Sequence, residues 1–171
     1  RHPEFSSGPC KKRPGYDLSS LRTDSLGRSH RSKLGKARLH KAIEDTKCIL
    51  EVPEDYLCAI VPASDTGAYE MAMWTMLGER PAEMVAWESF GAGWVTDVVK
   101  QLKIDASEHI APYGEIFDMA TLNYDHDVCF TWNGTTSGVC MRDGSAISSD
   151  RAGLTLCDAT SAAFAVDLPW D

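Results

Sequence analysis

The sequence predicts an α/β fold in which a mainly parallel sheet carries helices on both faces. Short continuous apolar runs, typical of strands buried on both sides, alternate along the chain with longer stretches of helical periodicity. The chain has 171 residues and 43% hydrophobic content, enough to bury a core without a disulfide or a metal. The apolar runs lie at 57–61, 84–87, 128–131 and 154–157, and the helical stretches at 32–50, 67–77 and 92–102.

The first part of the chain differs in composition from the rest. Residues 1–32 are rich in proline, glycine, serine and charge, which is typical of an extended arm with turns. After it, Leu34, Leu39 and Ile43 recur at near-helical spacing among charged residues, which indicates an amphipathic helix. We therefore expect an N-terminal arm over 1–32 and part of a larger α/β domain over 33–171.

Charge and cysteine content narrow the class of function. The formal net charge of -8 argues against a nucleic-acid or anionic-membrane partner, although local basic clusters can still bind a small anion. We find no apolar run of about 18 residues and no secretory signal, so we expect a soluble, cytoplasmic protein. The six cysteines are widely spaced, without metal-ligand clustering, and we expect reduced, mostly buried thiols and no metal.

The first candidate site is the turn after the apolar run 57–61. In open α/β sheets, ligands bind beyond the carboxyl ends of the strands. Here Ser64, Asp65, Thr66 and Gly67 open a helix, and the free N–H groups of a helix N-terminus favour a phosphate. Alternatively, the same residues merely cap the start of the helix.

The second candidate site combines a turn with an aromatic side chain. The turn 132–138 follows another apolar run and contains Asn133 and Thr135 among glycines, so it either approaches a planar ligand or is a plain turn. Trp94 lies beside glycines at a helix start, where its indole either stacks on a flat ring or belongs to the core.

Two further groups of residues complete the candidates. Asp158 directly follows the last apolar run, with Ser161 in the same turn; an ionised carboxylate there should face a cation or cap a helix. His30 and Arg31 lie where the arm meets the first helix, and they form either an anion pocket or an ordinary surface pair.

Taken together, six segments resemble the phosphoserine aminotransferase family, most closely its branch in α-proteobacteria and methanogens. The resemblance runs in order along essentially the whole chain, and each segment alone is ambiguous. The segments are Phe5–Cys10, Gly27–Ser32, Pro62–Gly67, Trp87–Trp94, Trp132–Gly138 and Asp158–Ser161.

This resemblance implies a fold-type-I enzyme that uses pyridoxal 5'-phosphate and works as a homodimer in the cytoplasm. Such an enzyme transfers an amino group between glutamate/2-oxoglutarate and phosphoserine/3-phosphohydroxypyruvate in serine biosynthesis. Residues 33–171 would then be part of its large, cofactor-binding domain.

The resemblance also implies a role for each candidate residue. Trp94 would stack on the cofactor ring, Asp158 would pair with the pyridine nitrogen, and Thr135 would lie near the ring hydroxyl. The remaining cofactor contacts would come from Asn133, Ser161 and the phosphate turn Ser64, Asp65, Thr66 and Gly67, and the substrate anion would meet Arg28, His30 and Arg31.

Two departures from the family pattern matter. The better-known branch carries a Gly-Arg pair in the phosphate turn, where this chain has Asp65-Thr66, so no arginine contact carries over. The family's Schiff-base lysine, in a Ser-Trp-Gln-Lys segment, matches none of the lysines here and would follow Asp171. We therefore expect an N-terminal fragment without the catalytic lysine, inactive alone.

Two alternatives stay open at this point. One is another fold-type-I aminotransferase, such as an alanine–glyoxylate aminotransferase, which shares the aspartate and aromatic roles. The other is a non-catalytic module that keeps the pyridoxal-phosphate pocket without the lysine.

Overall fold

The computed structural model describes residues 12–170. The chain separates into two compact units, Arg1–Glu44 and Asp45–Asp171. The arm segment Phe5–Cys10 lies outside the described residues. The predicted boundary between the arm (1–32) and the α/β domain (33–171) stays a prediction.

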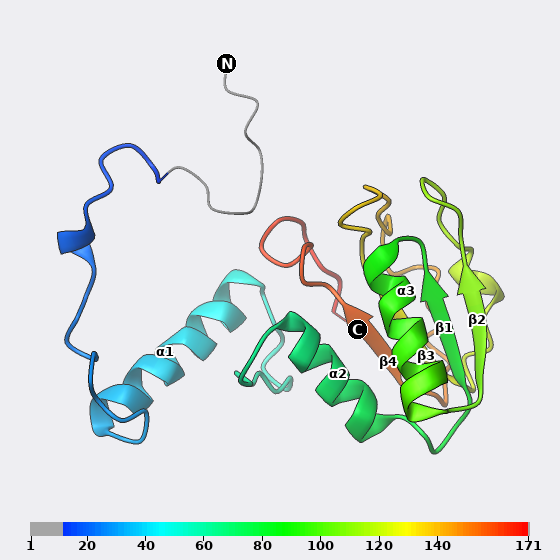
Figure 1. Cartoon of the computed structure of the whole chain (residues 1–171), viewed down its shortest axis with the longest axis horizontal. Coiled ribbons are helices and arrows are strands. Elements are labelled where there is room, and N and C mark those ends of the chain that lie inside the picture. The colour runs from blue at the N-terminus through cyan, green and yellow to red at the C-terminus, as the bar shows by residue number, and fades with distance from the viewer. Residues whose placement is uncertain (1–11, 171) are drawn as a thin grey trace. The chain divides into compact units, whose positions relative to one another are not determined.

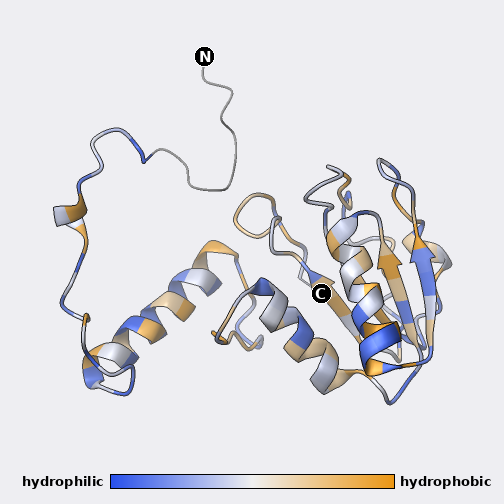
Figure 2. Ribbon diagram, in the orientation of Figure 1, coloured by the Kyte–Doolittle hydropathy of each residue, from blue (hydrophilic) through white to orange (hydrophobic). Residues whose placement is uncertain are grey.

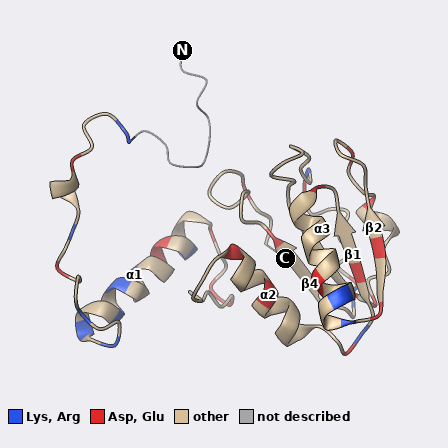
Figure 3. Cartoon of the chain, in the orientation of Figure 1, with Lys and Arg blue, Asp and Glu red and all other residues tan. Residues whose placement is uncertain are grey.

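The first unit consists of turns followed by a helix. A short 3₁₀ helix, η1 (Leu18–Ser20), interrupts the turns, and helix α1 (Lys33–Ile49) begins in this unit. The predicted helix over 32–50 is therefore confirmed. Figure 3 shows lysine and arginine along α1. Arg38 donates a hydrogen bond to Asp24, and this guanidinium lowers the pKa of that carboxyl.

The second unit contains a parallel four-stranded sheet with strand order β2-β1-β3-β4 (Figure 1). The predicted α/β class is confirmed. Because all neighbouring strands are parallel, the turns after them lie at one edge of the sheet, the carboxyl edge. The strands are β1 (Ala82–Ala86), β2 (Ala106–Ile110), β3 (Asp127–Thr131) and β4 (Thr155–Asp158).

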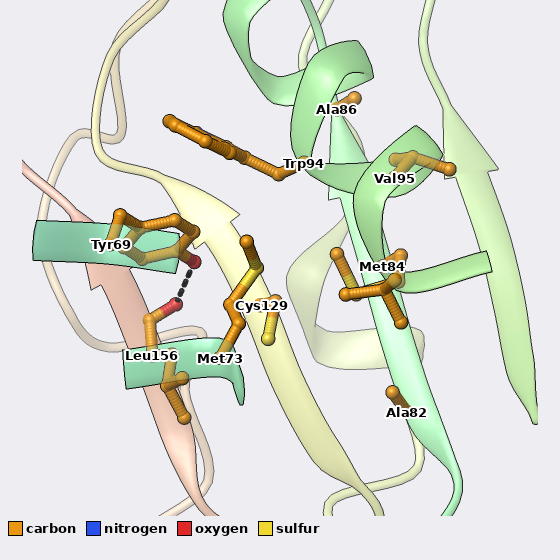
Figure 4. Close-up of a cluster of buried hydrophobic side chains, with 10 residues drawn as sticks. Tyr69, Met73, Ala82, Met84, Ala86, Trp94, Val95, Cys129 and Leu156 are labelled. Carbon is orange, nitrogen blue, oxygen red and sulfur yellow. Dashed lines mark hydrogen bonds between the residues drawn. The ribbon is translucent and has the colours of Figure 1, made fainter. Parts of the chain in front are cut away.

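Helices cover one face of this sheet. They are α2 (Asp65–Met76), α3 (Ser89–Thr96) and the π-helical turn η2 (Asp97–Leu102) that continues α3. Figure 4 shows Tyr69 and Met73 from α2 and Trp94 from α3 over alternate strand residues such as Met84. Because successive side chains of a strand point to opposite faces, these residues form one core.

The opposite face is covered differently from the expectation of helices on both sides. Among residues 12–170, the 3₁₀ helix η3 (Met119–Thr121) and loops pack there, burying Tyr124, Trp132 and Met141 against Phe130. The connecting segments are broken by proline, glycine and aspartate, which interrupt helices. Single large side chains therefore fill this layer in place of an α-helix.

The strands differ from the prediction at two places. The apolar run 57–61 was predicted to be a strand, but it has no regular structure, and Leu57 is fully exposed. The run is outside the described sheet, so it lacks the neighbouring strand that would complete its backbone hydrogen bonds. Conversely, β2 was missed because it is polar and half exposed, as expected of an edge strand; Figure 2 shows the contrast with β1.

The expectation of mostly buried cysteines was also wrong. Cys129 is buried, whereas Cys48, Cys140 and Cys157 are exposed. All the cysteines within residues 12–170 are free thiols, and Cys10 lies outside that range. No helix described in this range is long and apolar enough to cross a membrane.

Candidate active site at the carboxyl edge of the sheet

The sheet brings two of the predicted turns side by side. Thr131, the last residue of β3, is in register with Asp158, the last residue of β4. The amide of Trp132 also donates to the Asp158 carbonyl, at 2.8 Å. The turns 132–138 and 158–161 therefore start from adjacent points on the carboxyl edge.

Asp158 is bonded to the predicted ring-stacking tryptophan. The indole N–H of Trp94 donates to Asp158 Oδ2 at 3.1 Å, while Oδ1 accepts from the amide and hydroxyl of Thr160 at 3.0 and 2.6 Å. The segment after β4 is a turn, so Asp158 holds a turn in place of capping an α-helix. Its second oxygen joins that turn to α3.

The Tyr69 ring packs against the Trp94 indole, a contact that the sequence did not predict. Their ring centroids lie 5.0 Å apart at an interplanar angle of 51°. The Tyr69 hydroxyl donates to the Leu156 carbonyl of β4 at 2.9 Å, and burial raises the pKa of Tyr69 well above its usual value. The phenol is therefore a fixed neutral donor that ties α2 to β4.

The hydrogen bond from Tyr69 to Leu156 also places the start of α2, with the predicted phosphate turn, near β4. Ser64 precedes Tyr69 by five residues, roughly 7.5 Å along a helix axis. Its hydroxyl accepts from the Gly67 amide at 3.2 Å, which confirms the helix-capping role. Ser64, Asp65 and Thr66 are exposed to solvent, and binding of a phosphate there stays a prediction.

Ser161 connects the remaining predicted cofactor residues. Its hydroxyl lies 2.9 Å from Asn133 Nδ2 and 2.6 Å from the Thr135 hydroxyl. The Asn133 Oδ1 atom is buried and has no hydrogen-bond partner among the described residues. A buried acceptor without a partner is costly, so this atom is suited to a donor from a ligand.

The basic residues predicted for the substrate anion lie in the first unit. Arg28, His30 and Arg31 are all exposed, and the Arg31 amide donates to the Ser29 hydroxyl at 3.1 Å. Their role stays a prediction.

A separate cavity of about 400 Å³ lies on the loop-covered side of β4. Phe130, Trp132 and Trp170 line it with Cys157, and none of the predicted cofactor residues does. Its lining is mainly apolar and does not combine a carboxylate with convergent hydroxyls. The cluster around Trp94 and Asp158 is therefore the better candidate for chemistry.

Comparisons with known proteins agree with the sequence resemblance. Phosphoserine aminotransferase of Methanosarcina barkeri is 54% identical over 170 residues, covering 99% of this chain and 46% of that protein. The phosphoserine aminotransferase of Methanosarcina mazei is 53% identical over 171 residues, with the same coverage. No family model matches the chain.

A solved structure gives the same result. The crystal structure of a phosphoserine aminotransferase from Cytophaga hutchinsonii matches with a TM-score of 0.72 and 27% identity, over 83% of this chain and 40% of that one. The chain spans about half the length of the curated relatives. Along almost all of its length the chain is thus similar to the phosphoserine aminotransferases, and its α/β fold matches that of the solved one.

Proposed function

We propose that this chain is part of a phosphoserine aminotransferase of serine biosynthesis, a cytoplasmic homodimer that uses pyridoxal 5'-phosphate. The substrates would be phosphoserine/3-phosphohydroxypyruvate and glutamate/2-oxoglutarate. The observation that carries the proposal is the Trp94–Asp158 hydrogen bond at the carboxyl edge, which joins an aromatic ring and a carboxylate where this fold binds ligands.

The residues at this edge fit the cofactor. Bound pyridoxal phosphate would supply an electron sink for the carbanion formed at the substrate α-carbon. Asp158, whose carboxylate is half-buried and held by Thr160, would keep a proton on the ring nitrogen. Asn133, with its unpartnered Oδ1, and Thr135 would face the polar ring substituents.

The phosphate group of the cofactor fits the start of α2. Ser64, Thr66 and the first backbone amides of the helix offer donors, and the helix dipole favours an anion. Asp65 adds a negative charge there, and the turn lacks an arginine. Binding of the phosphate would therefore depend on the N–H and hydroxyl donors.

Stacking on Trp94 would require a local opening. The side chain is 6% exposed, and Tyr69 covers part of it. A ring can reach the indole only if neighbouring groups move. Polar contacts of that ring would then compete with the bond from Trp94 to Asp158 and with the bonds that Ser161 makes to the turn 132–138. Cofactor binding should therefore exchange these internal bonds for bonds to the ligand.

The substrate anion would be held by Arg28, His30 and Arg31. A guanidinium matches the two oxygens of a carboxylate or phosphate in a bidentate manner. All three side chains are exposed and so accessible to an incoming substrate.

The decisive experiment uses the product of the complete reading frame. With 2-oxoglutarate as acceptor, we expect glutamate formation from phosphoserine far faster than from alanine. Faster turnover of alanine, with glyoxylate supplied as its acceptor, would favour the alternative of an alanine–glyoxylate aminotransferase. Cofactor binding without turnover on either donor would favour a non-catalytic module.

The 171-residue chain itself should not form a covalent bond to the cofactor. In the second unit, Lys47 donates to the Tyr56 carbonyl, while Lys100 and Lys103 lie at the end of η2, away from the carboxyl edge. After incubation with pyridoxal phosphate and borohydride reduction, mass spectrometry should find no lysine modified in stoichiometric amount. Full labelling of a single lysine would contradict the expectation that none of these lysines is the Schiff-base residue.

A further inference from the structure

Glu88 is a buried carboxylate between helix α3 and the turn 132–138. It follows Trp87 after β1 and is 4% exposed. Its Oε1 accepts from the Gly91 amide at 2.7 Å, so it is the N-cap of α3. A cap needs only one carboxylate oxygen, and the burial of the second oxygen demands another partner.

That partner lies in the turn 132–138. The Thr136 hydroxyl donates to Glu88 Oε2 at 3.2 Å. The turn also packs directly on this side chain, because a Cβ placed on Gly134 would lie 2.6 Å from Glu88 Cγ. Only glycine allows the backbone to approach so closely.

A third loop supports the same hydroxyl. Because the carboxylate is only an acceptor, Thr136 donates its proton to Glu88 and can accept from the Tyr113 hydroxyl, 2.7 Å away. The Tyr113 oxygen in turn accepts from the Ser89 amide at 3.3 Å. The loop after β2 is thus tied to the same point.

These contacts close a ring of three hydrogen-bonded junctions. Trp94–Asp158 joins α3 to the turn 158–161, Ser161 joins that turn to the turn 132–138, and Thr136–Glu88 joins the latter back to α3. Two junctions consist of predicted cofactor residues, which a bound ligand would engage. The junction at Glu88 contains none of them and can persist while the other two exchange partners.

We infer that Glu88 is a positioning residue for the cofactor site: through Thr136 it holds the turn that carries Asn133 and Thr135 at a fixed distance from Trp94. This inference rests on the proposed function, because it takes the three hydrogen-bonded junctions to hold a cofactor site in shape. Neither substrate nor cofactor touches Glu88 in this role.

The test removes the Thr136 hydroxyl and leaves the helix cap in place. Thr136→Val keeps the shape, Thr136→Ser keeps the hydroxyl, and Thr96→Val is the matched control, because Thr96 makes a comparable exposed hydroxyl bond to the Ala92 carbonyl on α3. Amide hydrogen exchange is measured on the unliganded 171-residue chain. Pyridoxal-phosphate affinity is measured by calorimetry on the product of the complete reading frame.

For Thr136→Val we expect exchange in 133–138 to rise roughly five- to tenfold, as for the loss of one hydrogen bond, with the Gly91 amide unchanged. The dissociation constant for pyridoxal phosphate should rise by a similar factor. Thr136→Ser and Thr96→Val should both resemble the wild type.

Each other outcome contradicts a definite part of this account. Unchanged exchange in the turn means that Glu88 does not hold it, whatever the protein's function. Faster exchange with unchanged affinity means that Glu88 stabilises the fold alone. Absence of any pyridoxal-phosphate binding by the wild type overturns the proposed function, and the role of Glu88 with it, while the exchange result still tests the ring of contacts.

Discussion

Replacing Asp158 by alanine removes the acceptor of three hydrogen bonds at once. The Trp94 indole N–H is the costly one, since its side chain is 6% exposed and water cannot readily replace the carboxylate. Leaving such a donor unpaired costs about 1–3 kcal/mol. The two bonds from Thr160 lie in an exposed turn, where water substitutes, and together contribute about 1 kcal/mol.

We therefore expect Asp158→Ala to lower the free energy of unfolding by about 2–4 kcal/mol. The assay is urea unfolding followed by circular dichroism, in a double-mutant cycle with Trp94→Phe, which keeps an aromatic ring against Tyr69 but removes the N–H. The coupling energy between the two positions should be about 1.5–3 kcal/mol, the range for a hydrogen bond to a charged group.

Additive effects of the two substitutions would refute this reasoning, because they would mean that the Trp94–Asp158 bond contributes nothing to the folded state. The functional counterpart is measured on the product of the complete reading frame. There, loss of the partner of a buried ring cation should cost about 3–5 kcal/mol, or about two to four decades in turnover. Turnover within about tenfold of the wild type would reduce Asp158 to a turn residue.

Four further predictions concern other parts of the molecule. In the complete protein, Arg31→Ala should weaken binding of the anionic substrates by about 1.5–3 kcal/mol, the range for a hydrogen bond to a charged group. Arg22→Ala, which removes an exposed arginine paired with an aspartate, should not weaken it, and equal Michaelis constants for both variants would contradict the assignment. Gly134→Ala should destabilise the chain by about 1–3 kcal/mol in urea unfolding, since its Cβ would lie 2.6 Å from the buried α3 cap. Burial raises the pKa of Cys129 to about 12, so at pH 8 its reactive thiolate fraction is on the order of 10⁻⁴, and iodoacetamide mapping should label exposed Cys48 long before Cys129. Because the pKa of Cys129 is raised, the folded state keeps a proton that the unfolded thiol loses above its ordinary pKa of 9.0. The resulting contribution to the free energy of unfolding is complete below pH 9 and is lost by about pH 12. Cys129→Ala should therefore make the stability fall less steeply between these pH values.

The elements that the sequence predicted well are those with a strong local signal. The helix over 32–50 was found because its apolar positions repeat at helical spacing, and the central strands because they are short apolar runs. β2 escaped because an edge strand half exposed to water can be polar, and the run 57–61 misled because apolar character alone does not provide a neighbouring strand.

The candidate site shows the same division. Its residues could be listed from the sequence, because the turns after apolar runs are where ligands bind in such sheets and because six segments together match one family. Tyr69, Glu88 and Thr136 were missed. Each looks like an ordinary helix or turn residue locally, and its importance depends on a partner distant in the chain.

By itself, the sequence determined the α/β class, the family to which the chain is similar and the turns that hold the candidate residues, since all of these depend on local composition and order. Only the tertiary structure decided that Trp94 bonds to Asp158, that Ser161 joins the turn 132–138 and that Glu88 closes the ring through Thr136. The physical reason is that these contacts depend on the order and register of parallel strands. The order of the strands follows from packing across the whole sheet, so it cannot be read from any short segment of the sequence.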